Sequence, residues 1–180
     1  MDIENCVILI DNQDNQIGLI EKIEAHKKAL LHRAVSVFIC NSKGEWLLQQ
    51  RDENKYHSGG LWTNTCCTHP YPNETNIEAA KRRLNFEMGL KAELSQIYSF
   101  IYKEKLDNEL TEHELDYVFL GITDEIPKPN ADEVMNFKYV SYNNLALDIK
   151  QNPENYTVWF KKIVDIVNNH IIKVHEFSKK

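Results

Sequence analysis

Residues 62–90 read WTNTCCTHPYPNETNIEAAKRRLNFEMGL, and this stretch decides the fold. Its first part is a predicted loop, because Pro70 and Pro72 interrupt regular structure beside a thiol and an imidazole two residues apart. Its second part is a predicted helix, with one face formed by Ile77, Ala80, Leu84 and Met88. Gly89 is expected to end this helix, whose polar side carries Glu74, Lys81, Arg82, Arg83 and Glu87. A loop with candidate nucleophiles and metal ligands, leading into a helix with carboxylates at its ends, is typical of an active site.

Strand-like runs lie on both sides of this stretch. Those before it are Val7 to Ile10, Arg33 to Cys40 and Glu45 to Gln50, with a predicted hairpin turn at 41–44. Those after it are Leu94 to Tyr102, Glu112 to Gly121 and Phe137 to Ser141, followed by a helix beginning near Pro153. Residues 18–28 are ambiguous. Strands around one central helix predict an α/β or α+β fold, a mixed sheet sandwiched between helices, in a single domain over residues 1–180.

Composition excludes several classes of function. The net charge of −6 argues against nucleic acid as a partner. Asp2 and Glu4 stand where a secretory leader would carry basic residues, and the apolar run from Cys6 to Ile10 is too short to cross a bilayer. The four cysteines have neither metal-knuckle nor disulfide-framework spacing, so free thiols are expected, with Cys6 and Cys40 buried and inert. We therefore expect a soluble, cytoplasmic protein that has no membrane partner.

Two carboxylates share one face of a predicted strand. Side chains alternate along a strand, so Glu112 and Glu114 point one way while Leu115, Tyr117 and Phe119 point the other. Neighbouring carboxylates repel each other unless a cation lies between them or both reach water. For such a pair alone, an exposed strand end is the commoner explanation.

Three histidines extend this pattern. His26 and His32 flank the start of the strand that begins at Arg33, and His69 lies in the central loop. Any one of them alone is more often a surface or hydrogen-bonded residue than a ligand. Three imidazoles with two carboxylates would make a mixed nitrogen and oxygen site for Zn²⁺, Mn²⁺ or Mg²⁺. His57, His170 and His175 have no such neighbours in the sequence and are assigned no role.

Four basic residues come from separate segments of this acidic chain. They are Lys22, Arg51, Lys55 and Arg83. Taken singly, each is best explained as a solvated surface charge. Taken together with Glu87, they could hold a diphosphate, the arginines through paired hydrogen bonds and the carboxylate through a bound Mg²⁺.

Residues 68–90 resemble a degenerate Nudix box, G-x5-E-x7-R-E-U-x-E-E-x-G-U, in which U is aliphatic. The matching positions, with Thr68 in place of the first glycine, are Thr68, Glu74, Arg82, Glu87, Gly89 and Leu90. Arg83 and Phe86 stand where two glutamates are expected. Since those glutamates hold the catalytic Mg²⁺ of Nudix hydrolases, their loss argues against pyrophosphate hydrolysis.

A wider resemblance covers most of the chain, from about residue 18 to Trp159. The chain is similar to the type I isopentenyl-diphosphate isomerases, Nudix-fold enzymes with a box altered in this way. The stretches that carry the resemblance are 31–34 (LHRA), 62–64 (WTN), 67–70 (CTHP), 82–84 (RRL), 112–117 (EHELDY) and 131–134 (ADEV). It implies isomerisation of isopentenyl diphosphate to dimethylallyl diphosphate by protonation and deprotonation.

The resemblance also implies a role for each site residue. Cys67 and Glu114 would be the acid/base pair, with Tyr102 hydrogen-bonded near Glu114 and Trp159 facing the developing positive charge. The divalent metal site would consist of His26, His32, His69, Glu112 and Glu114. The diphosphate would be bound by Lys22, Arg51, Lys55 and Arg83. Glu87 and the main-chain carbonyl of Cys67 would help carry a Mg²⁺ on that diphosphate.

Two other functions stay open from the sequence. The first is a Nudix hydrolase of a nucleoside diphosphate derivative, against which Arg83 and Phe86 argue. The second is a catalytically silent Nudix-fold binding module, which would have no need of Cys67, Tyr102, Glu114 and Trp159 together. The identity of the His/Glu metal, the oligomeric state, the preferred reaction direction and the effect of Thr68 are also open.

Overall fold

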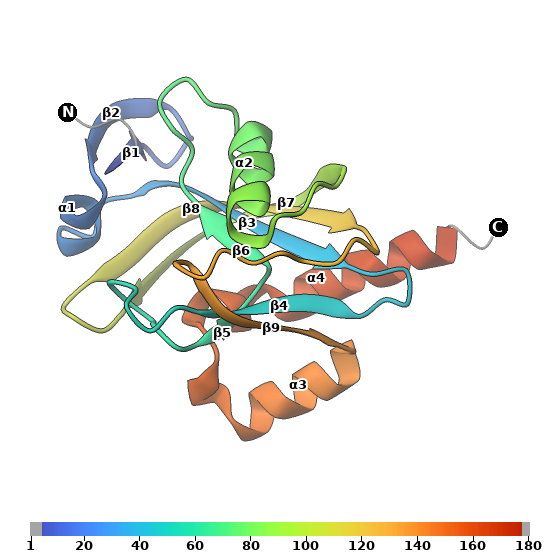
Figure 1. Ribbon diagram of the computed structural model, residues 1–180. Coiled ribbons are helices and arrows are strands. Elements are labelled where there is room, and N and C mark those ends of the chain that lie inside the picture. Colours follow the sequence, from blue (N-terminus) through green and yellow to red (C-terminus); the bar gives the residue numbers. More distant parts are fainter. Residues whose placement is uncertain (1–4, 178–180) are drawn as a thin grey trace.

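The computed structural model describes the backbone of residues 5–177 and the side chains of residues 5–171. Nine strands form one mixed sheet with helices on both of its faces (Figure 1), which confirms the predicted fold class. Asp2, Glu4 and the side chain of His175 lie outside the described residues. Across residues 5–177, no helix combines the length and apolar character needed to cross a membrane.

The elements follow one another in a mixed order. The strands are β1 (Cys6–Ile10), β2 (Gln16–Glu21), β3 (His32–Cys40), β4 (Trp46–Arg51), β5 (Trp62–Thr63), β6 (Cys66–Thr68), β7 (Leu94–Lys105), β8 (Thr111–Ile122) and β9 (Val134–Val140). The helices are α1 (Lys22–Lys27), α2 (Asn76–Met88), α3 (Tyr142–Gln151), the 3₁₀ turn η2 (Pro153–Asn155) and α4 (Val158–Phe177). The ambiguous residues 18–28 thus become the end of β2 and the short helix α1.

Strand β3 is the centre of the sheet. It runs parallel to β8 from the pair His32↔Glu114 to the pair Cys40↔Ile122, and antiparallel to β1, β4 and β6. Its side chains alternate between two cores, with Val35, Val37 and Ile39 in the core beneath α2 and Phe38 and Cys40 in the core against α4. Burial on both faces explains why this run is apolar without a polar alternation.

Helix α2 packs on one face of the sheet through small and apolar side chains. Thr75 and Glu78 form a capping box at its start, and Gly89 ends it with a left-handed φ of 62°, as the sequence predicted. A Cβ at Gly89 would lie 2.8 Å from the carbonyl oxygen of Lys128, so glycine is also required by close contact. Glu87 was expected on the polar side of the helix, and this was wrong. It is buried because it faces the sheet, where its carboxylate accepts a hydrogen bond from Gln49 on β4.

The predicted hairpin of β3 and β4 is confirmed, but the two strands soon separate. They pair at Ile39↔Leu47 and Cys40↔Trp46, beyond which residues 62–68 lie between them. The hydroxyl of Thr65 bridges the gap, since it accepts from the N–H of Ile39 at 2.9 Å and donates to the carbonyl of Leu47 at 2.8 Å. The loop predicted around Cys67 is therefore wrong: this segment forms β5 and β6, and β6 pairs with β3.

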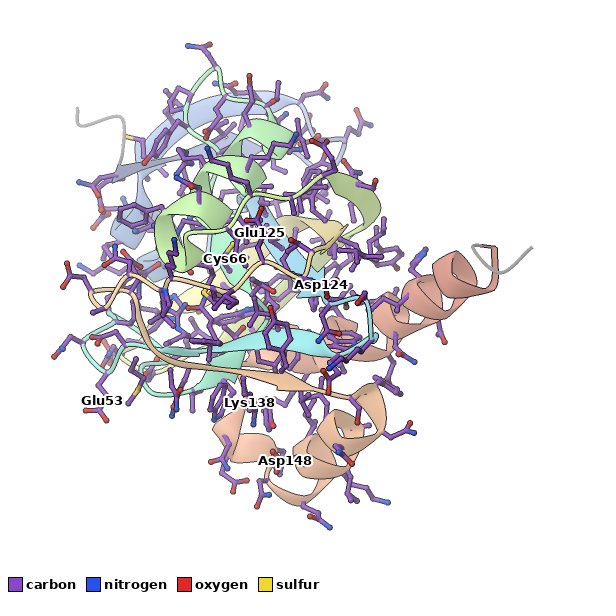
Figure 2. The ribbon with its side chains drawn as sticks, turned by 45° about the vertical axis from the view of Figure 1, so that its right-hand side comes forward. Glu53, Cys66, Asp124, Glu125, Lys138 and Asp148 are labelled. Atoms are coloured by element: carbon purple, nitrogen blue, oxygen red, sulfur yellow. The ribbon has the colours of Figure 1, made fainter. Side chains whose placement is uncertain are left out.

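The C-terminal part contains a helix that the sequence reading missed. Helix α3 buries Leu145, and its Asp148 lies 3.8 Å from Lys138 of β9 in an ion pair (Figure 2). The last helix begins at Val158 instead of near Pro153, because Pro153 opens a separate 3₁₀ turn. Cys6 and Cys40 are buried, and none of the four cysteines is joined in a disulfide within the described residues, as predicted.

Candidate active site

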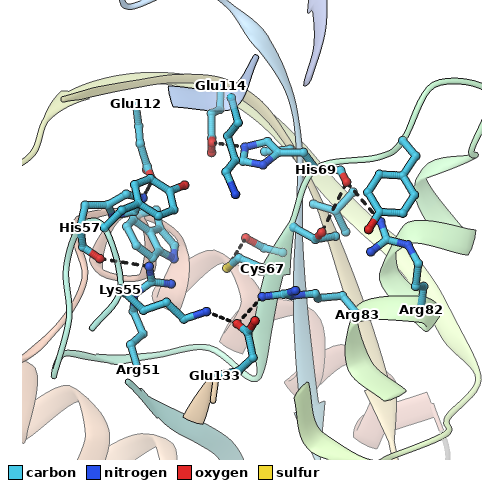
Figure 3. A pocket seen from close by; sticks show the side chains of 18 of the residues that line it. Arg51, Lys55, His57, Cys67, His69, Arg82, Arg83, Glu112, Glu114 and Glu133 are labelled. Atoms are coloured by element: carbon cyan, nitrogen blue, oxygen red, sulfur yellow. Dashed lines mark hydrogen bonds and ion pairs between the residues drawn. The ribbon is translucent and has the colours of Figure 1, made fainter. Parts of the chain in front are cut away.

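A cavity of about 240 Å³ opens between the first half of β3, the loop after β4 and the start of α4 (Figure 3). Most of the side chains singled out from the sequence line it. They are Lys22, Arg51, Lys55, Cys67, His69, Arg83, Tyr102, Glu112, Glu114 and Trp159. His26 and His32 are fully buried behind Glu114, and Glu87 is buried behind Arg83.

The predicted histidines converge on one carboxylate. The Nε2 atoms of His69, His32 and His26 lie 3.0, 3.4 and 3.9 Å from Oε1 of Glu114. Strand register places His32 beside Glu114, because these two residues are directly paired between β3 and β8. Helix α1 brings in His26, and the segment after β6 brings in His69.

The hydrogen bonds of two of these rings suit a metal site. Nδ1 of His26 donates to the carbonyl of Lys22 at 2.7 Å, and Nδ1 of His32 donates to the carbonyl of Leu30 at 2.8 Å. A neutral ring then presents the lone pair of its Nε2, and within residues 5–171 neither Nε2 has a hydrogen-bond partner. Lone pairs that face a carboxylate repel it unless a cation lies between them. The donor atoms of His26, His32, His69 and Glu114 all lie within 4.8 Å of one another, which fits a divalent ion.

Glu112 and Glu114 share one face of β8, as the alternation predicted, and both are buried. Their exposed fractions are 4% and 6%. The hydroxyl of Tyr102, opposite Glu114 on β7, lies 2.5 Å from Oε2 of Glu112 and 2.6 Å from Oε2 of Glu114. Burial and the charge of Glu114 raise the pKa of Glu112. Burial acts in the same direction on Glu114, but proton donation from the rings of His32 and His69, or a cation held between these rings and the carboxylate, outweighs it and lowers the pKa of Glu114 well below its usual range.

His57, to which the sequence reading assigned no role, belongs to this cluster. It is buried, and its Nε2 lies 3.5 Å from Oε1 of Glu112 (Figure 3). Burial lowers the pKa of His57 to about 2 and that of His69 to about 3, so both rings are neutral at pH 7. No periodic pattern in the sequence marks His57, because it lies in an irregular loop that contacts distant segments.

Cys67 faces the cavity while its neighbour Cys66 faces the other way. Side chains alternate along β6, so Cys66 packs in the core beneath α2 (Figure 2). Asn64 holds the Cys67 sulfur from one side, with Nδ2 at 3.2 Å and Oδ1 at 3.3 Å. Burial raises the pKa of Cys67 to about 12, so the group is a protonated thiol at neutral pH.

A buried hydroxyl and carboxylate lie on the other side of the thiol. The Oγ of Ser36 is 3.6 Å from the Cys67 sulfur and donates to Oδ2 of Asp116 at 2.7 Å. Burial, followed by the charge of Glu114, raises the pKa of Asp116 to about 7. The sequence reading gave these residues no role, although the alternation along β8 that paired Glu112 with Glu114 also places Asp116 on that face.

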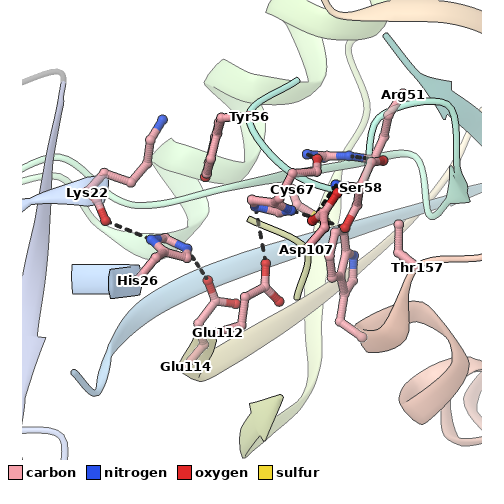
Figure 4. Close-up of polar contacts among 12 residues, drawn as sticks. Lys22, His26, Arg51, Tyr56, Ser58, Cys67, Asp107, Glu112, Glu114 and Thr157 are labelled. Carbon is pink, nitrogen blue, oxygen red and sulfur yellow. Dashed lines mark hydrogen bonds and ion pairs between the residues drawn. The ribbon is translucent and has the colours of Figure 1, made fainter. Parts of the chain in front are cut away.

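The four predicted cations gather at the opposite end of the cavity. Arg51 is fixed by donating to the carbonyls of His57 and Ser58, each at 3.1 Å (Figure 4). The Nζ of Lys22 lies 4.9 Å from the centre of the Tyr56 ring. Burial lowers the pKa of Lys55 to about 8, the attraction of Glu87 opposes this, and repulsion from Arg83, Arg51 and Lys22 adds to it. Like charges held this close in an acidic protein indicate an anion site.

Glu133 is a cavity residue that the sequence reading did not single out. Its carboxylate contacts Lys55 and accepts from Arg83 at 2.6 Å (Figure 3). Arg83 also donates from Nε to Glu87 at 2.5 Å, and Gln49 donates to the second oxygen of Glu87 at 2.6 Å. Both oxygens of Glu87 are thus hydrogen-bonded, and Glu133 is the carboxylate that faces the cavity beside the cations.

Trp159 closes the cavity from α4. Its indole N–H donates to Oδ1 of Asn64 at 3.3 Å, which links it to the residue that holds Cys67. The guanidinium carbon of Arg51 lies 5.4 Å from the centre of its ring, and the ring of His57 meets it edge-on at 5.8 Å. The ring therefore lies between the cationic end of the cavity and the His/Glu end.

Comparison with known proteins finds relatives along most of the chain. The sequence profile of the NUDIX domain matches residues 30–160. An isopentenyl-diphosphate Delta-isomerase of Pectobacterium atrosepticum is 49% identical over 155 residues, 86% of this chain and 87% of that protein. Isopentenyl-diphosphate Delta-isomerase 2 of Aromatoleum aromaticum is 46% identical over 164 residues, 91% of this chain and 87% of that protein.

Solved structures share the fold at low sequence identity. DR0079 from Deinococcus radiodurans aligns with a TM-score of 0.74 and 16% identity, over 89% of this chain and 97% of that one. A MutT protein from Methanosarcina mazei aligns with a TM-score of 0.64 and 20% identity, over 78% of this chain and 94% of that one. At these identities the likeness concerns the fold alone.

Proposed function

The chain belongs to the Nudix family and, within it, to the isopentenyl-diphosphate Delta-isomerases, and from this we propose how its cavity converts isopentenyl diphosphate into dimethylallyl diphosphate. One observation carries the proposal. A thiol, a carboxylate among three imidazoles, and four cations all belong to a single cavity and its wall. We take the chain to be one catalytic domain over residues 1–180.

Cys67 and Glu114 supply the donor and the acceptor for the reacting carbons. The thiol of Cys67 gives its proton to the terminal methylene carbon of the substrate, which leaves a tertiary carbocation-like centre at carbon 3. A proton then leaves carbon 2 to Glu114, and the double bond forms between carbons 2 and 3. One proton enters the substrate and one leaves it, so reactant and product are isomers, and exchange with solvent after product release restores the pair.

The protonation states in the protein support these roles. The raised pKa of Cys67 keeps the thiol protonated, whereas the lowered pKa of Glu114 keeps its carboxylate ionised. Tyr102 orients Glu114 by its hydrogen bond to Oε2, which leaves Oε1 to the histidines. Trp159 presents an aromatic face that stabilises positive charge, a contribution of about 2 kcal/mol in a dry site. The cavity walls also exclude water, which would otherwise trap the cation.

The cationic end of the cavity binds the diphosphate. Lys22, Arg51, Lys55 and Arg83 offer ammonium and guanidinium groups of the kind that bind phosphate oxygens. In the free protein, Glu133 neutralises Lys55 and Arg83. We propose that Arg83 moves from its carboxylate partners to the diphosphate, and that Glu87 and the main-chain carbonyl of Cys67 then help carry a Mg²⁺ on it.

The His/Glu cluster is suited to hold a divalent ion. His26, His32, His69 and Glu114 would bind it, with Glu112 beside them, and nitrogen and oxygen donors of this kind suit Zn²⁺, Mn²⁺ or Mg²⁺. Such an ion supplies fixed positive charge that favours the ionised form of Glu114.

Hydrolysis of a nucleoside diphosphate derivative has less support, because Arg83 and Phe86 replace two metal-binding glutamates of the Nudix box. The test is incubation of the purified protein with isopentenyl diphosphate and Mg²⁺, followed by proton NMR and a phosphate assay. We expect dimethylallyl diphosphate to appear without phosphate release. Phosphate release without movement of the double bond would contradict the proposal.

A further inference from the structure

His57 and Glu112 face each other in the same way as His32 and Glu114 of the main His/Glu cluster. Nε2 of His57 lies 3.5 Å from Oε1 of Glu112, and Nε2 of His32 lies 3.4 Å from Oε1 of Glu114. These separations are long for hydrogen bonds. They match the spacing of two ligands on one ion, since tetrahedral ligands with bonds of about 2.0–2.1 Å lie about 3.3–3.4 Å apart.

A third donor completes this group. Atoms of His26, His57 and Glu112 all lie within 4.8 Å of one another, and all three side chains are buried. Nδ1 of His26 donates to the carbonyl of Lys22 (Figure 4), and its Nε2, 3.9 Å from Oε1 of Glu114, has no hydrogen-bond partner within residues 5–171 and is available to this group. Oε2 of Glu112 lies 2.5 Å from the hydroxyl of Tyr102, so Oε1 is the oxygen that faces His57.

Distant segments hold His57 in position. Arg51 donates to its carbonyl and to that of Ser58, and the backbone N–H of Ser58 donates to the carboxylate of Asp107 at 3.2 Å (Figure 4). Asn108 donates to the carbonyl of Tyr56 at 3.0 Å. The loop is thus anchored on both sides of His57 before any ligand binds, as a preformed metal site requires.

We propose that His57, Glu112 and His26 form a second position for the divalent ion, which adjoins the first and shares His26 with it. One Nε2 lone pair binds one ion at a time, so the two positions are alternatives for a single ion. An ion in the second position leaves Glu114 without a metal bond, whereas an ion in the first position leaves His57 free. His57 is therefore a metal ligand of this chain, in addition to the histidines and glutamates that its resemblance to the isomerases implies.

The test measures metal binding without substrate, so its result does not depend on the proposed isomerisation. Zn²⁺ affinity is determined by calorimetry for the wild type, His57→Asn, His69→Asn and the double variant. His170→Asn, which removes a partly exposed imidazole from α4, is the matched control. In the His69→Asn background the first position has lost a ligand, so a larger share of the bound Zn²⁺ occupies the second position. There we expect His57→Asn to weaken Zn²⁺ binding at least about tenfold. The control should bind like the wild type.

A second measurement separates a direct ligand from a neighbour that only supports the site. In protein labelled with ¹⁵N at histidine, Zn²⁺ should shift the Nε2 resonances of both His26 and His57, and the shift of His57 should grow in the His69→Asn variant. An unshifted His57 Nε2 beside a shifted His26 Nε2 would overturn the proposal. Equal Zn²⁺ affinity of His69→Asn and the double variant would overturn it as well. The NMR measurement on the wild type decides the matter even if His57→Asn does not fold.

Discussion

Cys66 and Cys67 offer a matched pair for testing which thiol reacts. They are adjacent on β6 and point to opposite faces of the sheet, one into the core beneath α2 and the other into the cavity. Replacing Cys67 with alanine removes the proposed proton donor but leaves the four cations in place, since the hydrogen-bond partners of its sulfur are Ser36 and Asn64. We expect Cys67→Ala to lower kcat by about two to four orders of magnitude, the usual contribution of a positioned acid or base.

The expected loss of stability in Cys66→Ala follows from the burial of this side chain. Its side chain is fully buried and packs against α2, so Cys66→Ala leaves a small cavity and should reduce the free energy of unfolding by about 1 kcal/mol. Its kcat should stay within about twofold of the wild-type value, because its side chain faces the core beneath α2 and does not line the cavity. Cys66→Ala should therefore lose stability and keep its activity, whereas Cys67→Ala should lose activity.

Three measurements on each variant separate these effects. Turnover of isopentenyl diphosphate is followed by NMR, binding of inorganic pyrophosphate with Mg²⁺ by calorimetry, and the free energy of unfolding by urea titration. Alkylation gives a further check, because a thiol with a pKa of about 12 is ionised in only about one molecule in 10⁵ at pH 7. Iodoacetamide should therefore react slowly with Cys67. Equal loss of turnover in both variants, or retained turnover in Cys67→Ala, would refute the assignment.

Three further predictions concern the rest of the cavity. Tyr102→Phe removes a hydroxyl shared by two buried carboxylates, so the free energy of unfolding in urea should fall by about 2 kcal/mol and kcat should fall as well, whereas unchanged values would contradict its orienting role. Arg83→Glu should weaken pyrophosphate binding at least about tenfold through charge repulsion without creating phosphate release, because Phe86 still fills the second glutamate position; measurable release would contradict this. Burial lowers the pKa of Lys55 from an ordinary 10.5 to about 8. Between pH 8 and pH 10.5 the unfolded chain therefore binds more protons than the folded protein, and the free energy of unfolding should rise with pH. Below pH 8 the buried ammonium destabilises the fold by its full amount. Bound pyrophosphate favours the charged form, so calorimetry at pH 8.5 in two buffers of different ionisation heat should show proton uptake that Lys55→Gln abolishes.

The sequence predicted correctly those features that depend on residues close together in the chain. The spacing of apolar residues and a terminal glycine were enough to find α2 and its end at Gly89. Alternation along β8 correctly placed Glu112 and Glu114 on one face, because side-chain direction in a strand depends only on position. Only the resemblance to the isomerases implied that His26 and His32 would share a site with Glu114; they lie beside it because β3 pairs in parallel with β8, which no spacing in the sequence reveals.

The missed features have causes that are distant in the sequence. The short strand β6 exists because residues 62–68 insert between β3 and β4, where Thr65 bonds to both strands. His57 is buried because Arg51 and Asp107 fix the loop that carries it, and Asp107 lies 49 residues further along the chain than Ser58. Glu87 seemed polar by its charge, yet it is buried because Gln49 on the neighbouring strand supplies a partner. Such contacts follow from the tertiary fold and leave no periodic pattern.

The altered Nudix box also explains why the chemistry takes place away from phosphorus. Of the two box glutamates that remain, Glu74 is paired with Arg82 at 2.7 Å, and both oxygens of Glu87 accept hydrogen bonds. Phe86 is half exposed and packs against the guanidinium of Arg83, whose carbon lies 5.2 Å from the ring centre. The box therefore retains one carboxylate that a departing Arg83 can free, enough to hold a cation on a diphosphate but too few to activate a water against phosphorus. Among the described residues, the ring nitrogens that have no hydrogen-bond partner belong instead to His26 and His32, which lie behind Glu114 at the other end of the cavity.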